Sequence, residues 1–217
     1  MTTILALGAA GSTGHVGDWS RRLVQEADTR GHRLIVVDRP ENLLGSAVAS
    51  NPRHHAVAAD FAHADAVRAA VAHLGAPDAV IGFREYSLVA AARLAEEAGV
   101  PWNGLAQVVA SRAKDTTRET LRSAGLPQPG VCSFGTAGAA REDLRAATLP
   151  SIVKPQDAFG SQGVRLVRDD TEIDAAISTA FDFSANILVE DYVVGAEFSV
   201  EGIILGGSPH MLDITRK

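Results

Sequence analysis

Cysteine is almost absent from this sequence, whose 217 residues include only Cys132. A single thiol excludes an intrachain disulfide and a cysteine-based zinc site within one chain. Free cysteine is among the most often buried residue types. We therefore expect Cys132 to be a small core residue in a strand and not a nucleophile.

Excess positive charge and long apolar runs are also missing. The formal net charge is -6 and there is no long basic run, so composition does not favour a nucleic-acid partner. The first residues, MTTILALGAAGSTG, lack a charged n-region, and their apolar run is too short for a signal peptide or a membrane-spanning helix. We expect a cytoplasmic protein without a membrane partner, in which 46% hydrophobic residues supply a core. A homo-oligomer is compatible with this composition.

The first hundred residues alternate between apolar strands and amphipathic helices. Continuous apolar runs such as HRLIVVD are typical of parallel strands that are covered on both faces. The spacing predicts strands at residues 3–8, 32–38, 54–58 and 77–83, and helices at 18–30, 63–74 and 87–99. Alternating strands and helices predict a doubly wound α/β domain with a parallel sheet, which we place at residues 1–110.

The pattern changes in the second half of the chain. A short helix and a longer one, from about Ala113 to Ser123, lead into the rigid connector LPQPG. Short stretches rich in β-branched residues then predict strands, with one helix near 171–180. These stretches are SIVKP, GVRLV, ANILVEDYV and AEFSVEGIIL. They predict a smaller α+β unit at residues 111–217.

Glycines cluster at the first strand–helix turn, where Gly8, Gly11 and Gly14 stand in GAAGSTGHVGD. Glycines let the backbone approach a phosphate closely, and a helix N-terminus offers free N–H groups. Asp38 ends the second strand, about where a ribose-binding acid lies in a dinucleotide fold. The spacing is not G-x-G-x-x-G, however, and glycines here also serve to pack a helix against a sheet. An NAD(P)-dependent oxidoreductase that uses the Gly8–Gly14 cluster is therefore one open alternative.

Polar residues of the second half suit a different ligand. Two separated lysines, Lys114 and Lys154, and the loop QDAFGSQG could neutralise and wrap a polyphosphate. The strand end at Glu190 offers backbone groups to an adenine edge, and the carboxylate of Glu197 can accept both ribose hydroxyls. Taken singly, these residues also fit solvated charges, turn glycines and edge-strand carboxylates. Taken in order, they predict a nucleotide site.

Four blocks of the sequence, in the family's order, resemble the ATP-grasp superfamily and in particular its carboxylate–amine ligases. The blocks are PDAVIGFREYSLVAAARLAEEAGVPWNG, AKDTTRETLRSAGLPQPG, IVKPQDAFGSQGVRLV and LVEDYVVGAEFSVEG. The resemblance covers nearly the whole chain. It implies a Rossmann-like domain over residues 1–110, followed over 111–217 by an incomplete α+β ATP-grasp domain that binds ATP.

The resemblance also implies a role for each matching residue of the nucleotide site. Lys114 and Lys154 would contact the phosphates of ATP, and a mobile loop from Asp157 to Gly163 would close over the γ-phosphate with Ser161 as a donor. The strand end and the residues after it would hold adenine and ribose. The implied ATP-binding residues are Lys114, Lys154, Asp157, Gly160, Ser161, Gly163, Glu190, Asp191, Tyr192, Val193 and Glu197.

The implied reaction is the activation of a carboxylate by ATP to an acylphosphate, which an amine then attacks. Catalysis of this kind depends on positioning and charge neutralisation, with Mg²⁺ bridging phosphate oxygens. Glu201 matches a family acid at the substrate end of the cleft, and Glu85 follows a strand on the side that would face substrates. A surface salt bridge is the alternative explanation of Glu85. No catalytic residue can be named from the sequence.

Members of this family usually continue further, through the region that supplies the Mg²⁺ ligands and a basic residue near the transferred phosphoryl group. Here the sequence stops at HMLDITRK, and Asp213 alone cannot make an octahedral metal site. We therefore expect Mg²⁺ to have no ligands in this chain, and the chain to bind ATP but to be inactive alone. A non-catalytic nucleotide-binding module is the second open alternative.

Overall fold

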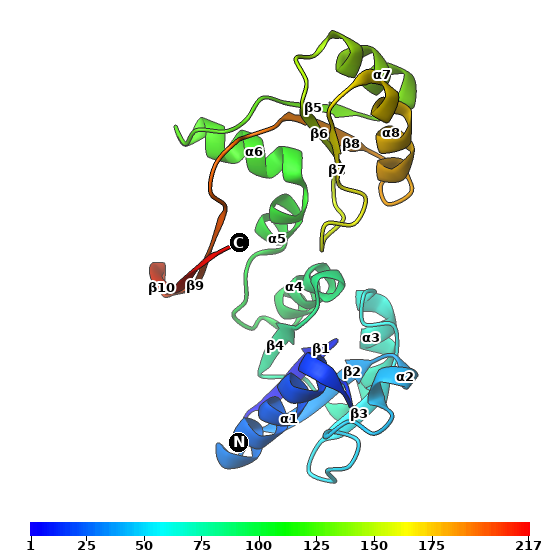
Figure 1. The fold of residues 1–217 in the computed structure, drawn as a ribbon. Coiled ribbons are helices and arrows are strands. Elements are labelled where there is room, and N and C mark those ends of the chain that lie inside the picture. Colours follow the sequence, from blue (N-terminus) through cyan, green and yellow to red (C-terminus); the bar gives the residue numbers. More distant parts are fainter. The chain divides into compact units, whose positions relative to one another are not determined.

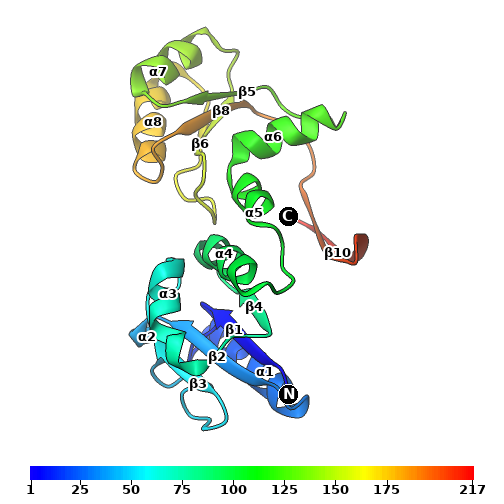
Figure 2. The ribbon, with the colours of Figure 1, turned by 180° about the vertical axis from the view of Figure 1, so that it is seen from behind.

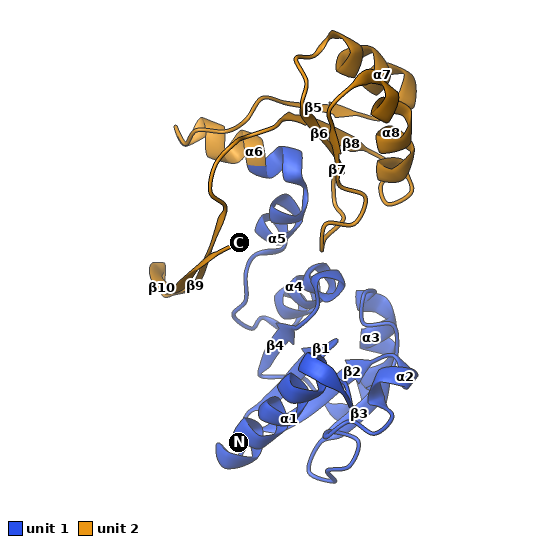
Figure 3. Ribbon diagram, viewed as in Figure 1, with its two compact units in different colours: residues 1–117 blue, residues 118–217 orange.

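The computed structural model of the protein describes residues 1–217 and divides into two compact units, Met1–Thr117 and Arg118–Lys217 (Figure 3). Each unit has a hydrophobic core of its own. The units divide inside helix α6 (Lys114–Ser123), whereas the boundary that we predict after residue 110 lies inside α5 (Leu105–Arg112). That boundary stays a prediction about the domains.

The first unit is built on a four-stranded parallel sheet with the strand order β3-β2-β1-β4. Its strands are β1 (Thr3–Leu7), β2 (Arg33–Asp38), β3 (His55–Ala58) and β4 (Ala79–Gly82). Its other helices are α1 (Gly14–Thr29), α2 (Pro40–Leu43), α3 (Ala64–Val71) and α4 (Leu88–Ala98). The chain order changes direction between β1 and β4, which is the switch point of a doubly wound sheet.

Both faces of the parallel sheet are covered because its strands are apolar at successive positions. Leu5 and Leu7 of β1 belong to a core cluster that also contains residues of α3 and α4. Ala6, on the opposite face of the same strand, belongs to a second cluster with residues of α1 and α2. Figures 1 and 2 show the sheet and its helices from opposite sides. The predicted doubly wound α/β fold of this half is thus confirmed.

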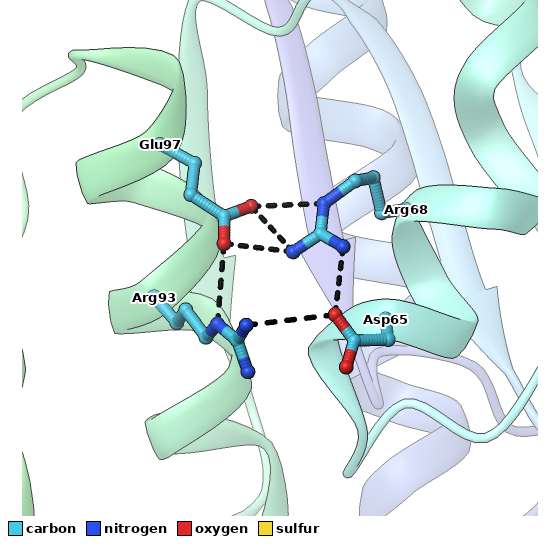
Figure 4. Close-up of polar contacts among 4 residues, drawn as sticks. All are labelled: Asp65, Arg68, Arg93 and Glu97. Carbon is cyan, nitrogen blue, oxygen red and sulfur yellow. Dashed lines mark hydrogen bonds and ion pairs between the residues drawn. The ribbon is translucent and has the colours of Figure 1, made fainter.

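Four charged side chains form a ring that joins α3 to α4 (Figure 4). Arg68 lies 2.7 Å from Glu97 and 2.7 Å from Asp65, and Arg93 lies 3.1 Å from Glu97 and 3.6 Å from Asp65. The hydrogen bonds from Arg68 lower the pKa of both carboxyl groups. Because opposite charges alternate around the ring, it links the two helices without adding net charge.

The second unit contains a four-stranded antiparallel sheet with the strand order β5-β8-β6-β7. Its strands are β5 (Val131–Phe134), β6 (Ser151–Pro155), β7 (Arg165–Val167) and β8 (Ile187–Asp191). Helices α7 (Ala137–Ala146) and α8 (Ile173–Phe181) contribute apolar side chains to one core together with Val153 and Val189 of the sheet. This α+β arrangement confirms the fold predicted for the second half.

Two further strands, β9 (Phe198–Leu205) and β10 (Ser208–Arg216), form a separate two-stranded antiparallel sheet. Their pairing shifts register between Met211 and Asp213. Every residue of β10 is exposed. None of the helices of the protein is long and apolar enough to cross a membrane.

Two expectations about the second half are wrong. We predict one helix after the connector, whereas the structure has two, α7 and α8. At the start of α7, the hydroxyl of Thr136 accepts a hydrogen bond from Ala139 N at 3.4 Å. Cys132 is exposed and not a core residue. It lies on β5, which is an edge strand, so one side of its backbone has no neighbouring strand.

Candidate functional site

Lys154 and Glu190 lie on the same face of the antiparallel sheet. In the register of β6 and β8, Ile152 pairs with Glu190 and Lys154 pairs with Leu188, so Lys154 and Glu190 are diagonal neighbours. Val153 and Val189 point to the other face, into the core with α7 and α8. The Nζ atom of Lys154 lies 2.6 Å from Oε2 of Glu190. The alternation of side chains along two predicted strands thus positions both charged groups away from the core.

Arg118 is the third member of this cluster and is not among the site residues predicted from the sequence. Its Nε and Nη2 donate to the two carboxylate oxygens of Glu190 at 3.0 and 3.1 Å, and its Nη1 donates to Gln128 Oε1 at 2.9 Å. Arg118 stands one helical turn after Lys114 on α6, on the same side of the helix. That spacing is the signal that could have directed attention to it.

The cluster places two cations around one buried carboxylate. The side chain of Glu190 is 5% exposed and that of Lys154 13% exposed. Burial acts to raise the pKa of Glu190, but the hydrogen bonds from Arg118 and Lys154 outweigh it and lower the pKa. Burial lowers the pKa of Lys154, and the carboxylate offsets only part of that effect. With all three groups charged, the cluster has one positive charge in excess and is suited to an anionic ligand.

The loop after β6 has an unusual backbone. Gly160, Ser161 and Gly163 all have positive φ, and Ser161 is the only non-glycine residue of the protein with this conformation. A side chain at Gly163 would lie 2.7 Å from Pro155 and 2.8 Å from Phe183, so only glycine fits there. The loop contains Asp157, and Asp157, Gly160 and Ser161 are exposed. Within and directly after the loop, Gln162 N donates to Phe159 O and Val164 N donates to Ser161 O, both at 3.3 Å. Consecutive residues with positive φ also occur in turns that bind anions.

Residues 191–193 follow Glu190, and their backbone N–H groups differ in their hydrogen-bond partners. Asp191 N donates to Gly130 O at 3.1 Å, and Tyr192 N donates to Pro150 O at 3.4 Å. Val193 is 67% exposed, and its N–H makes no hydrogen bond in the structure. Among the three residues predicted to hold adenine, Val193 is therefore the one whose N–H is available to a ligand.

The remaining predicted site residues lie outside this cluster. Glu197 precedes β9, its side chain is 70% exposed, and it lies 3.2 Å from Lys217 Nζ. Glu201 is an exposed residue of β9 that pairs with Asp213 of β10. Lys114 is the first residue of α6 and belongs to the first unit. The structure thus brings together Lys154, Glu190 and the segments that follow them, but not Glu197 or Glu201.

In the first unit, the glycine cluster has structural tasks. Gly8 has a φ of 70°, and a side chain there would lie 3.0 Å from Arg84. A side chain at Gly11 would lie 2.6 Å from Val16 of α1. Gly14, the first residue of α1, also has a positive φ. Packing of a helix against the sheet therefore explains Gly11, whereas Gly8 is explained by its positive φ and its close approach to Arg84.

Asp38 is fully buried and its carboxylate is used by the protein itself. Oδ2 accepts from Ala10 N at 2.9 Å, and Oδ1 accepts from Arg39 N at 2.8 Å and from Asn42 Nδ2 at 2.7 Å. A ribose would have to break these bonds to reach the carboxylate. This geometry speaks against the alternative of an NAD(P)-dependent oxidoreductase that uses Asp38.

Glu85 lies in the segment between β4 and α4 and takes part in an ion pair. Its Oε1 lies 3.3 Å from Nη1 of Arg112, whose guanidinium also lies 5.9 Å from the ring centre of Tyr86. This contact agrees with the alternative explanation of Glu85 as a salt-bridge partner. Elsewhere, no three His, Cys, Asp or Glu side chains gather into a group that could hold a metal ion. The expectation that Mg²⁺ has no ligands in this chain stays a prediction.

Two family models match the chain, one in each half. The ATP-grasp N-terminal domain matches residues 24–102, and the D-ala D-ala ligase C-terminus matches residues 120–215. The chain belongs to the ATP-grasp superfamily. The resemblance identified from the four sequence blocks is thus confirmed.

Individual relatives of this ATP-grasp chain support the assignment. It is 32% identical over 109 residues to a D-alanine–D-alanine ligase of Haemophilus ducreyi, a match that covers 48% of the chain and 36% of the relative. The structure of an L-amino acid ligase from Bacillus licheniformis has a TM-score of 0.75 at 22% identity and covers 100% of the chain and 50% of the ligase. A carboxyaminoimidazole ribonucleotide synthase from Aspergillus clavatus in complex with ATP has a TM-score of 0.76 at 18% identity, covering 99% and 53%.

At 22% and 18% identity, these two solved structures show that the fold is shared and nothing further. This ATP-grasp chain spans about half the length of those structures and about a third of the Haemophilus ligase.

Proposed function

We propose that the second unit of this chain binds ATP, as the nucleotide-binding part of a ligase that activates a carboxylate and joins it to an amine. One observation carries the proposal. A buried carboxylate, Glu190, holds Lys154 at the end of β6, directly before the loop that contains Asp157, Gly160, Ser161 and Gly163. A cation, a glycine loop and the strand end to which we assign adenine binding therefore lie in one unit.

The charge of the cluster and the loop backbone fit the phosphates of a nucleotide. The excess positive charge of Arg118, Lys154 and Glu190 attracts phosphate oxygens, and the loop with positive φ at Gly160, Ser161 and Gly163 would wrap them. The Val193 N–H, which has no acceptor in the protein, would donate to the adenine edge. We assign a second phosphate contact to Lys114, the ribose to Glu197, and the substrate end to Glu85 and Glu201.

In the proposed reaction, a carboxylate oxygen of the acid attacks the γ-phosphorus of ATP, the bond to the leaving ADP oxygen breaks, and an acylphosphate forms. The amine nitrogen then attacks the acyl carbon, phosphate leaves, and the nitrogen loses a proton. The residues of this chain would neutralise and orient the phosphates, which is the main protein contribution to phosphoryl transfer. The relatives support this reaction class, since they include D-alanine–D-alanine ligases and an L-amino acid ligase.

Calorimetric titration of the chain with ATP tests the proposal. Lys154→Ala should weaken ATP binding by roughly tenfold or more, because a hydrogen bond to a charged group contributes about 1.5–3 kcal/mol. The matched control is Arg145→Ala, which removes one exposed positive charge from α7 in the same unit. Unchanged affinity of the Lys154 variant would contradict the proposed site.

Two further measurements separate the alternatives. Titration with NADPH should give no saturable signal, because both oxygens of Asp38 already accept hydrogen bonds, from Ala10 after β1 and from Arg39 and Asn42 after β2. ADP release that depends on an added amino acid would support the ligase reaction. Binding of ATP without any such release would favour the non-catalytic nucleotide-binding module.

A further inference from the structure

The loop after β1 forms one wall of a small cavity in the first unit. The cavity has a volume of about 70 Å³. Its lining is apolar except for one guanidinium group and consists of Gly8, Ala9, Val16, Trp19, Phe83 and Arg84. The ATP site proposed above does not use any of these residues.

The position of the cavity in the sheet is the place where doubly wound folds bind ligands. Gly8 and Ala9 directly follow β1, and Phe83 and Arg84 follow β4. The strand order β3-β2-β1-β4 makes these two strands the switch point, and ligands of such sheets bind outside the carboxyl ends of the strands there. Topology and cavity therefore indicate the same site.

Several contacts hold the cavity walls in place. Arg84 donates from Nε to Gly8 O at 2.9 Å and from Nη2 to Ala10 O at 3.0 Å. Ala10 N in turn donates to the buried carboxylate of Asp38 at 2.9 Å. On the other side, Gly11 packs against Val16 so closely that a side chain would clash. The cavity is thus formed before any ligand arrives, which reduces the entropy cost of binding.

We propose that this cavity binds the short branched aliphatic side chain of an amino-acid substrate, with Arg84 beside the carboxylate of that substrate. A cavity of about 150 Å³ holds a benzene molecule, so a volume of about 70 Å³ suits three or four carbon atoms. The apolar lining excludes a polar side chain, whose hydrogen bonds to water would be lost without replacement.

Arg84 supplies the charge that an amino-acid carboxylate requires. Its side chain is 33% exposed. Nε and Nη2 donate to Gly8 O and Ala10 O, and Nη2 also lies 3.8 Å from the Asp38 carboxylate, whereas these contacts do not use Nη1. The guanidinium also lies 5.7 Å from the ring centre of Phe61, which fixes its orientation. The assignment of the ligand as a substrate rests on the proposed ligase function, whereas its chemical class rests on the cavity.

The tryptophan in the cavity wall makes binding directly measurable. The chain has two tryptophans, Trp19 and Trp102. The indole N–H of Trp102 is buried without a hydrogen-bond partner, so Trp102→Phe should be tolerated and leaves Trp19 as the only fluorophore of its kind. Valine and leucine should then change the Trp19 fluorescence saturably, with millimolar dissociation constants.

Two other amino acids test the polarity and the size of the cavity. Asparagine is close to leucine in size but polar, and phenylalanine is apolar but too large; both should bind at least tenfold more weakly than valine or leucine. An equal response to asparagine and leucine, or no saturable response to either valine or leucine, would overturn the inference.

Variants of the wall provide the second readout. Ala9→Leu fills the cavity and should abolish valine binding, whereas Ala66→Leu places the same side chain on the exposed surface of α3 and should leave it unchanged. Trp19→Ala, at a side chain that is 57% exposed, opens the wall without disturbing the core and should weaken binding, as seen by ligand-observed NMR. Valine binding that survives both Ala9→Leu and Trp19→Ala would overturn the site.

Titration of the same samples with ATP separates this inference from the proposed function. Binding of ATP without binding of valine or leucine would overturn the inference and leave the proposed ATP site intact. Binding of valine without binding of ATP would support the proposed ligand of the cavity and overturn the proposed nucleotide function.

Discussion

Lys154 and Arg118 share one carboxylate oxygen: Lys154 Nζ lies 2.6 Å and Arg118 Nη2 3.1 Å from Oε2 of Glu190. Arg118 belongs to α6 and Lys154 to β6, so Glu190 of β8 joins a helix and two strands through a single group. A carboxylate in this position lets two cations approach each other that would otherwise repel. Removing any one of the three groups should therefore affect the other two.

Removal of Arg118 should reduce the stability of the second unit. Arg118→Ala leaves the buried carboxylate of Glu190 with Lys154 alone, and the loss of its charged hydrogen bonds should cost about 2 kcal/mol of unfolding free energy. Arg122→Ala is the matched control on the same helix, since Arg122 pairs with Glu119 at 2.8 Å in an exposed position, and should cost well under about 1 kcal/mol. Urea unfolding followed by circular dichroism measures both; equal effects would contradict a structural role of the cluster.

Alkaline pH should weaken ATP binding earlier than is usual for a lysine-dependent site. Burial lowers the pKa of Lys154, so its ammonium group loses its proton below the usual range, and the charge that attracts phosphate is lost as pH rises. Calorimetric titrations at increasing pH should show this decline, together with uptake of protons on binding. Lys154→Arg should retain affinity at high pH, because a guanidinium stays protonated there. A decline of the same size in the arginine variant would assign the effect to another group.

The two glycines of the loop after β6 should respond differently to alanine. A side chain at Gly160 meets nothing within 4 Å, so Gly160→Ala should cost only the strain of its positive φ, about 1 kcal/mol. Gly163→Ala adds steric clashes with Pro155 and Phe183, and should cost about 2 kcal/mol or more. Thermal unfolding of the two variants gives the comparison. Similar melting temperatures would mean that the loop can rearrange around the added methyl group.

Acid should destabilise the first unit through His54, whose side chain is fully buried. Its Nδ1 accepts from Leu34 N at 3.2 Å, and burial lowers the pKa of the imidazole below its usual 6.5 even though Asp28 lies 3.3 Å from Nε2. The other charged groups that act on it are Arg53 and His55. A histidine with a lowered pKa binds more protons when unfolded, so its contribution is complete above pH 6.5 and is lost as pH falls below that value.

Urea unfolding at a series of pH values between neutral and mildly acidic tests this expectation. His54→Asn keeps an acceptor near Leu34 N but cannot gain a proton, so its stability should fall less steeply with acid than that of the unchanged chain. Identical slopes for the two proteins would assign the acid sensitivity to other groups.

The parallel sheet of the first unit was predictable because apolar runs and glycine stops are local signals. The last six residues of HRLIVVD form β2, and all of them except Arg33 are buried. Gly99 ends α4 in the expected left-handed conformation. The residue types of the loop after β6 were equally visible in the sequence, and two of its glycines have the positive φ that their loop position suggests. The roles of these residues in ATP binding remain predictions.

The missed elements carry weaker local signals. Only Ala140 and Leu144 of α7 are buried, so the apolar periodicity that indicates an amphipathic helix is weak there. The register shift between Met211 and Asp213 interrupts the alternation of β10. Arg118 is one of several charged residues of α6, and its partner is 72 residues away, so only the folded structure brings the pair together.

The exposure of Cys132 has a practical consequence. It is the only thiol of the chain, it lies on an edge strand, and its register partner is Val189, the residue before Glu190. A maleimide dye would therefore attach to unmodified protein at one known place, one strand away from the proposed adenine contact. Fluorescence from that dye could follow a nucleotide entering and leaving without any engineered label, so the scarcity of cysteine in this chain becomes an experimental advantage.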